Sequence, residues 1–270
     1  ENQRVSSLRD VLTGYDSLLV GFSGGADSSF LLKAAVDFLG RENVLAVTAS
    51  GAIFPEREVE AARKIARTLD ARWHLIQRDY LDEREFRSNP TNRCYHCKRG
   101  LFEVLKELAE KRSYEEVADG SITDDISGHR PGRAAGKELG IKRPLEEAEL
   151  RKEDIRELSR KTGLPTWDKP SNACLATRIP FEEKITKKKL NQVAEAESVL
   201  LDLGFSGFRV RHHGDLARIE LNTEEITSAV KKRTSIVERL KPHGFSYVTL
   251  DLEGYRSGSL TEATDVDNSS

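Results

Sequence analysis

The stretch from Ser17 to Gly40 limits the fold of this chain more than any other part of its sequence. It opens with the apolar run SLLVGF, passes through SGGADSS and ends with FLLKAAVDFLG, whose apolar residues recur at helical spacing. The first run is too short for a helix and rich in strand-forming residues, so we expect a strand, a glycine turn and a helix. This succession is typical of the start of a parallel α/β sheet.

The alternation of strand and helix patterns continues along the N-terminal part of the chain. We expect further strands at 44–49, 73–76 and 116–118, and helices at 56–69, 101–109 and 152–161. Gly163 and Pro165 mark the end of the last of these helices. The sequence therefore predicts an α/β domain over residues 1–168, with a Rossmann-like, mostly parallel sheet and helices on both faces.

Prolines mark the border of this domain. Pro165, Pro170 and Pro180 interrupt a segment that cannot be one regular element, and we place the domain junction there. The residues that follow, 169–260, predict a smaller α+β domain. Its expected elements are helices at 187–203 and 224–240, paired strands at 208–213 and 216–221, and a strand at 247–252. The polar, acidic residues 261–270 are expected to form a disordered tail.

Size and charge exclude several classes of protein. A chain of 270 residues is long for one hydrophobic core and fits two domains. Its 43 Lys and Arg nearly balance 45 Asp and Glu, which argues against a basic groove for nucleic acid. No apolar run is long enough to cross a bilayer and no leader pattern begins the chain. We therefore expect a cytoplasmic protein that binds neither membrane nor nucleic acid.

The SGGADSS segment lies where the first strand meets its helix. Its glycines allow close backbone approach, and a helix N-terminus presents N–H groups and positive dipole, so the expected ligand is a phosphate group. The segment has neither the lysine of the Walker motif nor the glycine spacing of the dinucleotide motif, which excludes both. In isolation, SGG could equally be a serine-capped helix after a tight turn.

The whole string resembles the pyrophosphate-binding loop of the ATP pyrophosphatase (PP-loop) superfamily, which cleaves ATP to AMP and pyrophosphate. The resemblance implies ATP and Mg²⁺ as cofactors, with Asp27 positioning the metal. Because nucleotides bind at the carboxyl ends of strands in such sheets, Ala49 and Ser50 are candidate adenine contacts. The complete set of expected ATP-binding residues is Ser23, Gly24, Gly25, Asp27, Ser28, Ser29 and Ser50.

Three cysteines form the second chemical feature of the sequence: Cys94 and Cys97 in NRCYHCKRG, and Cys174 in KPSNACLATRIP. An odd number of cysteines in a chain of this size fits thiol chemistry or metal binding better than a disulfide framework. A single CxxC also fits a redox dithiol, or a zinc site that Cys174 and either His96 or His129 complete. The three cysteines could also be unrelated buried thiols. The spacing alone does not decide among them.

Four segments together resemble the LarE family of ATP-dependent sulfur transferases, which build the nickel-pincer nucleotide cofactor of lactate racemase. They are SGGADSS, DGSITDDISGHRPG, the stretch from Pro144 to Pro180, and FRVRHHGDLARIEL. The resemblance implies that ATP adenylates a carboxylate of pyridinium-3,5-biscarboxylic acid mononucleotide and that sulfur then displaces AMP. It also implies a small-molecule nucleotide substrate, a sulfide or other sulfur donor, and a downstream nickel-insertion enzyme as partners. We further expect a homo-oligomer.

The family divides on the source of the sulfur. Members with three cysteines are thought to bind a [4Fe-4S] cluster, which here implies Cys94, Cys97 and Cys174 as ligands and sulfide carried on the open iron. Members with one cysteine give up its sulfur, and the sequence leaves open that Cys174 acts in this way. Two other functions also remain open: cluster-dependent tRNA thiolation, and a nucleotide-sensing module with a structural zinc.

Charged residues complete the predicted site. Arg209 and Arg211 are two residues apart on a predicted strand, so their side chains point to the same face. Such a pair could bind one phosphate group together, or it could belong to an ordinary solvated face. The resemblance implies that these two hold the substrate phosphate, and Arg178, four residues after Cys174, is a further candidate for the same anion. It also implies catalytic roles for Lys98, near the reacting carboxylate, and for Glu197, near Cys174. Further expected candidates are Asp124 and Asp125, which could bind magnesium or ribose or simply cap turns.

Overall fold

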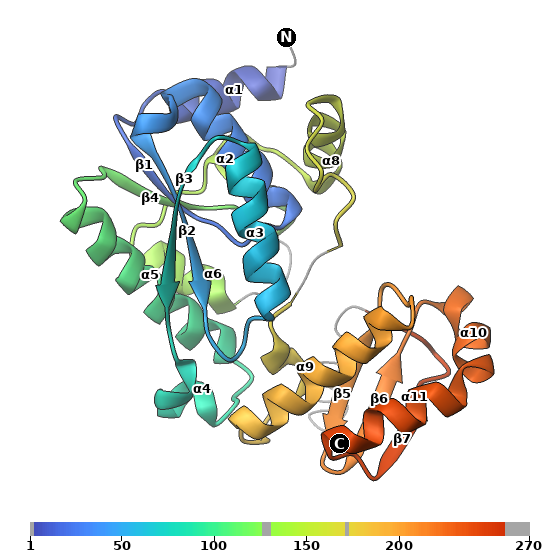
Figure 1. The fold of residues 1–270 in the computed structure, drawn as a ribbon. Helices are drawn as coiled ribbons and strands as arrows, with labels where there is room; N and C mark the ends of the chain where they lie inside the picture. Colours follow the sequence, from blue (N-terminus) through green and yellow to red (C-terminus); the bar gives the residue numbers. More distant parts are fainter. Residues whose placement is uncertain (1–2, 126–130, 171–172, 257–270) are drawn as a thin grey trace, which may run out of the picture. The chain divides into compact units, whose positions relative to one another are not determined.

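A computed structural model describes residues 3–125, 131–170 and 173–256 of the chain, so the predicted tail at 261–270 and His129 lie outside the described residues. The chain divides into two compact units (Figure 1). The first comprises residues 1–79 and 92–172, and the second comprises residues 80–91 and 173–270. The sequence placed the junction between 168 and 169 and gave no sign that 80–91 would join the second unit.

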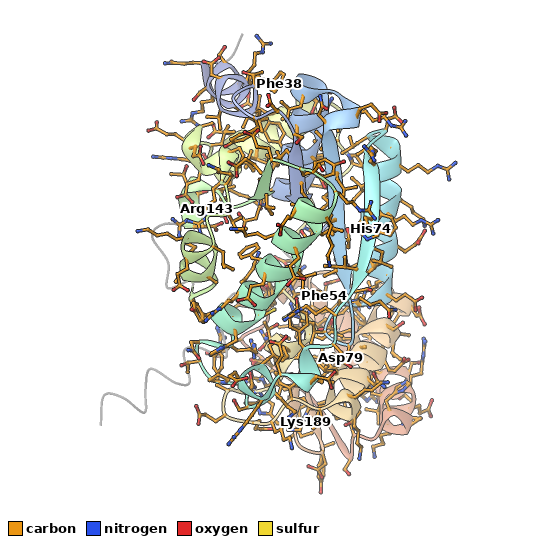
Figure 2. All side chains as sticks on the ribbon, turned by 90° about the vertical axis from the view of Figure 1, so that its left-hand side faces the viewer. Phe38, Phe54, His74, Asp79, Arg143 and Lys189 are labelled. Carbon is orange, nitrogen blue, oxygen red and sulfur yellow. The ribbon has the colours of Figure 1, made fainter. Side chains whose placement is uncertain are left out.

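The first unit is built on a parallel sheet with the strand order β3-β2-β1-β4. Its strands are β1 (Leu18–Gly21), β2 (Val44–Ser50), β3 (Arg72–Gln77) and β4 (Glu116–Asp119). β3 forms one edge and carries His74, whose ring nitrogen lies 3.4 Å from a guanidinium nitrogen of Arg112 (Figure 2). All four predicted strands are confirmed, and β1 and β2 are the two whose sequences are strongly apolar runs.

Helices cover both faces of this sheet. Side chains alternate along β1, so Leu18 and Val20 pack into one hydrophobic core and Leu19 into another. The first core is closed by α1 (Gln3–Leu12), α2 (Ala26–Leu39), α3 (Glu56–Thr68), α7 (Pro144–Glu147) and α8 (Lys152–Lys161). The second is closed by α5 (Arg93–Lys111) and α6 (Pro131–Glu138). The predicted Rossmann-like α/β architecture is confirmed.

The strand order reverses at β1. The chain runs from β1 through β2 to β3 on one side and then returns to place β4 on the other side of β1. The segments that follow β1 and β4 are therefore neighbours: a Cβ on Gly120 would lie 2.9 Å from the backbone nitrogen of Ser28. Ligands of open α/β sheets bind at such a switch point.

Helix α5 is longer than predicted. The apolar spacing indicated a helix at 101–109, whereas the helix begins at Arg93 and includes both Cys94 and Cys97. Its first turns carry Cys, Tyr, His and Lys rather than a regular apolar stripe, so periodicity gave no signal there. The CxxC motif consequently lies on a helix and not in a loop.

The second unit is a small α+β structure. Helix α9 (Lys187–Asp202) packs on a sheet in which β5 (Arg209–His213) is antiparallel to β6 (Leu216–Glu220), and β7 (Tyr247–Leu250) is parallel to β6. The predicted helix at 224–240 is wrong as a single element. It divides into α10 (Ile226–Lys231) and α11 (Arg233–Leu240), separated at Lys232, whose side chain donates to the carbonyl oxygen of Leu203.

Residues 80–91, with α4 (Arg84–Arg87), belong to the second unit through buried contacts. Asn89 is completely buried, and its side-chain amide donates to the carbonyl oxygens of Pro180 and Glu183 at 2.6 and 3.0 Å. Phe86 is also completely buried. Among the helices that the structure describes, none has the length and apolar character needed to cross a membrane.

Candidate active site

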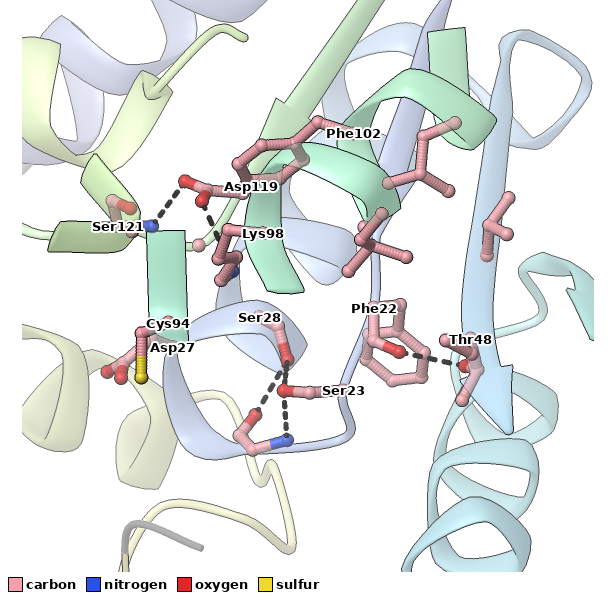
Figure 3. Close-up of a pocket in the computed structure, with 18 of the residues that line it drawn as sticks. Phe22, Ser23, Asp27, Ser28, Thr48, Cys94, Lys98, Phe102, Asp119 and Ser121 are labelled. Carbon is pink, nitrogen blue, oxygen red and sulfur yellow. Dashed lines mark hydrogen bonds and ion pairs between the residues drawn. The ribbon is translucent and has the colours of Figure 1, made fainter. Parts of the chain in front are cut away.

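A cavity of about 550 Å³ opens at the carboxyl ends of β1, β2 and β4 in the first unit (Figure 3). Its wall combines the loop after β1, the loop after β4 and the first turns of α5 and α6. The lining residues used below are Ser23, Gly25, Asp27, Ser28, Ala49, Glu58, Cys94, Lys98, Phe102, Asp119 and Asp125. Its position coincides with the switch point of the sheet.

The loop after β1 is held open toward this cavity by its backbone. Gly24 has φ +69°, and a Cβ there would lie 2.8 Å from Cα of Ala62 in α3. Gly25 caps α2, and its N–H donates to the hydroxyl of Ser23 at 3.3 Å. The hydroxyls of Ser23 and Ser28 lie 3.1 Å apart (Figure 3). The serine hydroxyls and the N-terminus of α2 thus lie at the cavity wall, an arrangement that suits the binding of a phosphate group.

Two predicted ATP-binding side chains point elsewhere. Ser29 is completely buried in the first turn of α2, and its hydroxyl has no hydrogen-bond partner within the described part of the chain. Ser50 donates its hydroxyl hydrogen to the carbonyl oxygen of Ile76 on β3, whereas Ala49 lines the cavity.

Asp27 is paired with a lysine that the sequence analysis did not identify. Lys152 Nζ lies 2.6 and 2.7 Å from the two carboxylate oxygens of Asp27. The backbone N–H of Lys152, at the start of α8, donates to Asp124 at 2.7 Å. The second acidic candidate, Asp125, accepts the N–H of Ile122 at 3.2 Å and lines the cavity.

Lys98 occupies the opposite wall of the cavity, on α5. Its Nζ lies 3.6 Å from an oxygen of Asp119 and 5.0 Å from the ring centroid of Phe102 (Figure 3). Asp119 ends β4, is 8% exposed, and accepts the N–H of Ser121 at 3.0 Å. A cation is thereby fixed over an aromatic ring at the cavity wall, where it can stabilise negative charge.

The three cysteines are carried by different units. Cys94 and Cys97 lie in the first turns of α5 in the first unit, and Cys174 belongs to the second unit. None of them forms a disulfide. Residues three apart on a helix share a face, so the thiols of Cys94 and Cys97 suit two ligands of one metal centre. Within the described residues, no three His, Cys, Asp or Glu side chains are assembled as a metal site.

The arginines predicted to hold a phosphate lie buried in the second unit. Arg178 donates to both carboxylate oxygens of Glu197 at 2.8 and 3.2 Å, and Arg211 donates to Glu220 at 2.7 Å. Arg209 lies 4.9 Å above the ring of Tyr255. Burial, followed by the nearby charge of Arg178, lowers the pKa of the Arg209 guanidinium. Glu197 therefore neutralises part of a cluster in which arginines predominate.

Sequence reasoning missed three polar residues around the loop after β1: Lys152, Asp119 and Lys169. Lys169 Nζ donates to the carbonyl oxygen of Gly24 at 3.0 Å and to Glu58 at 2.9 Å. The position of Asp119 at the carboxyl end of a predicted strand was a usable signal. The two lysines are far from the loop in sequence and lie in charged segments, so no local pattern distinguishes them.

Comparisons with known proteins agree with this geometry. The sequence profile of the NAD synthase family matches residues 2–87. An uncharacterized protein of Synechocystis sp. is 41% identical over 260 residues, which cover 95% of this chain and 96% of that protein. The pyridinium-3,5-bisthiocarboxylic acid mononucleotide synthase of Lactiplantibacillus plantarum is 36% identical over 258 residues, covering 96% and 92%.

A more distant likeness extends to a glutamine-hydrolysing GMP synthase of Bdellovibrio bacteriovorus, 27% identical over 219 residues that cover 73% of this chain and 42% of that protein. The NAD synthase match contains the loop after β1, and the match to the mononucleotide synthase spans both units. The chain therefore belongs to the LarE family of ATP-dependent sulfur transferases, with a PP-loop domain as its first unit.

Proposed function

We propose that this protein uses ATP to convert a carboxylate of pyridinium-3,5-biscarboxylic acid mononucleotide into a thiocarboxylate, as a step toward the nickel-pincer cofactor. A carboxylate oxygen of the substrate attacks the α-phosphorus of ATP, the α–β anhydride bond breaks, and pyrophosphate leaves. Sulfur then attacks the carbonyl carbon of the acyl adenylate, the bond between that carbon and the AMP oxygen breaks, and AMP leaves with the electron pair.

The observation that carries this proposal is the cavity at the switch point of the first unit, in a chain that matches a named mononucleotide synthase over nearly its whole length. In the proposed reaction, the backbone N–H groups after β1 and the hydroxyls of Ser23 and Ser28 bind the leaving pyrophosphate. Asp27 would hold Mg²⁺, which neutralises the phosphates when bound. Lys98 stabilises the negative charge that develops at the reacting carboxylate.

The buried arginines of the second unit supply the proposed site for the substrate phosphate. Arg209 and Arg211 leave the same face of β5, and Arg178 is held by Glu197. Burial strengthens the attraction of such a cluster for an anion, because little water screens it. In this proposal Glu197 acts through Arg178 and keeps its guanidinium oriented beside Cys174, whose carbonyl oxygen accepts from Arg178 at 3.3 Å.

For the sulfur source we propose a [4Fe-4S] cluster held by Cys94, Cys97 and Cys174. When bound through three thiolates, such a cluster leaves one iron able to carry sulfide. The i, i+3 spacing of two of the thiols on α5 fits this donor set, and Cys94 lines the cavity next to Lys98. A protein that gave up the sulfur of Cys174 would instead produce one product equivalent per chain.

The test is a turnover assay on protein purified without oxygen and reconstituted with iron and sulfide. We expect about four irons per chain and a brown colour. With ATP and the biscarboxylate mononucleotide, pyrophosphate release should precede repeated formation of thiocarboxylate. The variants Cys94→Ala and Cys97→Ala should retain pyrophosphate release and lose repeated turnover.

Four results would contradict parts of this proposal. Stoichiometric zinc in colourless protein would remove the cluster. Intact repeated turnover in the Cys94→Ala variant would remove Cys94 from the sulfur-carrying site. Loss of the Cys174 sulfur to leave dehydroalanine would make Cys174 the donor. Pyrophosphate release that depends on tRNA would replace the proposed substrate.

A further inference from the structure

The ion pair between Lys152 and Asp27 joins two residues that are 125 positions apart in the sequence. Asp27 lies in the first turn of α2 and lines the cavity, and both of its carboxylate oxygens accept from one ammonium group. The side chains remain 27% and 29% exposed, for Lys152 and Asp27 respectively. Neither side chain is therefore sealed in a core, and Asp27 is accessible to a solute that enters the cavity.

The backbone of Lys152 is held independently of its side chain. Lys152 is the first residue of α8, its N–H donates to Asp124, and the helix start is closed by Asp154 accepting from the N–H of Arg151. Asp124 belongs to the segment after β4, and Asp27 to the segment after β1. Lys152 thus connects both segments of the switch point through a flexible four-carbon stem, which can turn without moving the helix.

An ammonium group is a replaceable partner for Asp27 at this position. Mg²⁺ binds to proteins through one or two carboxylates together with phosphate oxygens of a substrate. A lysine is in turn a strong point-charge partner for phosphate. A triphosphate arriving with Mg²⁺ therefore offers each member of the pair a better partner: the metal for Asp27 and the phosphate oxygens for Lys152.

We propose that Lys152 is a further ATP-binding residue of this protein. In the nucleotide-free protein it neutralises Asp27, and on ATP binding it moves to the β- and γ-phosphates and leaves Asp27 to Mg²⁺. This inference rests on the proposed function in one respect, namely that ATP is the ligand of the cavity. AMP lacks both terminal phosphates, so Lys152 contributes to the affinity for ATP and not to that for AMP.

The experiment compares binding constants, not turnover, for the wild type and the variants Lys152→Ala, Lys152→Gln and Lys161→Ala. The ligands are AMP and the α,β-methylene analogue of ATP, titrated calorimetrically with Mg²⁺ and again with EDTA. Lys161 is the matched control, since it lies on the same helix and pairs with a carboxylate, Glu157, outside the cavity. Lys152→Gln keeps a donor for Asp27 without the positive charge, and serves alone if Lys152→Ala does not fold.

We expect both Lys152 variants to bind the ATP analogue about tenfold or more weakly, with AMP affinity changed less than about twofold. Their ATP binding should also depend more strongly on Mg²⁺ than that of the wild type, because without Lys152 only the metal offsets the charge of Asp27 and the phosphates. Unchanged affinity for the ATP analogue, or an equal loss for AMP, would overturn the proposal and leave Lys152 a structural partner of Asp27. A wild type that binds neither nucleotide would instead refute the proposed function.

Discussion

Gly24 combines two constraints that a single methyl group would violate. Its φ of +69° disfavours any residue with a Cβ, and that Cβ would lie 2.8 Å from Cα of Ala62. We expect Gly24→Ala to shift the loop after β1 away from α3 and to weaken ATP binding by about tenfold or more. The free energy of unfolding should fall by more than the roughly 1–2 kcal/mol that a left-handed alanine costs by itself. Thermal unfolding and nucleotide titration measure the two effects.

Gly40 is the matched control for this substitution. It also has positive φ, +82°, but no atom lies within 4 Å of the position its Cβ would take among the described residues. Gly40→Ala should therefore show the backbone cost without the loss of ATP binding. Equal nucleotide affinity in the two alanine variants would mean that the contact with Ala62 does not shape the loop.

At the residue scale, the sequence predicted what is local and missed what is distant. Ser23, Gly25 and Ser28 were identified because the loop after β1 is a contiguous motif, and they line the cavity. Lys152 reaches Asp27 only through the packing of α8 beside α2, which no short pattern encodes. The different roles of neighbouring serines also depend on the helix start: both are buried, but Ser28 lines the cavity and Ser29 does not.

Strand β5 places two histidines where protonation is unfavourable. Burial is the main cause that lowers the pKa of both His212 and His213 below the ordinary 6.5, with Lys189 and Arg218 as the next contributions and Glu183 opposing them. The unfolded chain therefore binds protons that the folded chain does not as pH falls below about 6.5. The stability contributed by the neutral histidines is complete above this pH and is lost as pH falls toward their folded pKa.

We expect the unfolding temperature of the second unit to fall between about pH 7 and pH 5, before carboxylates titrate. Calorimetric scans across this range measure it. His213→Gln should flatten the dependence. A pH profile that is flat in the unmodified protein would show that these side chains are solvated in solution.

At the scale of elements, apolar patterns were reliable where a helix has one buried face, or where a strand is buried on both faces as β1 and β2 are. The strands β1 and β2 and the helices α3, α8 and α9 follow such patterns closely. The start of α5 did not follow such a pattern, because the residues that line the cavity there, Cys94 and Lys98, do not belong to an apolar stripe. The division between α10 and α11 lies in a run of lysine, arginine, threonine and serine, where no apolar spacing marks a break.

On the scale of the whole molecule, the chain passes between the two units three times, because residues 80–91 are built into the second. We expect Asn89→Ala to lower the free energy of unfolding by about 1–3 kcal/mol or more, since carbonyl oxygens of Pro180 and Glu183 would lose a buried donor. Hydrogen exchange should then accelerate in residues 173–256 and not in the parallel sheet.

Asn43→Ala provides the comparison for this prediction. Its side chain also donates to a carbonyl oxygen, that of Leu39, but in an exposed position where water can replace it. The change should cost little. If exchange accelerates equally in both units of the Asn89→Ala protein, the segment 80–91 stabilises the whole chain and not the second unit alone. The sequence could not foretell this arrangement, because 80–91 has the composition of an ordinary surface loop.

Lys169 anchors the segment that leads to Cys174. Its ammonium group is anchored to Gly24 and Glu58, and Cys174 follows it by only five peptide steps, which extend at most about 18 Å. As long as this anchor holds, chain length alone limits how far Cys174 can lie from the loop after β1, which binds ATP in the proposed reaction. Sulfur carried at Cys174 would act as a reagent at high local concentration, so that its transfer competes with water for each acyl adenylate at the moment it forms.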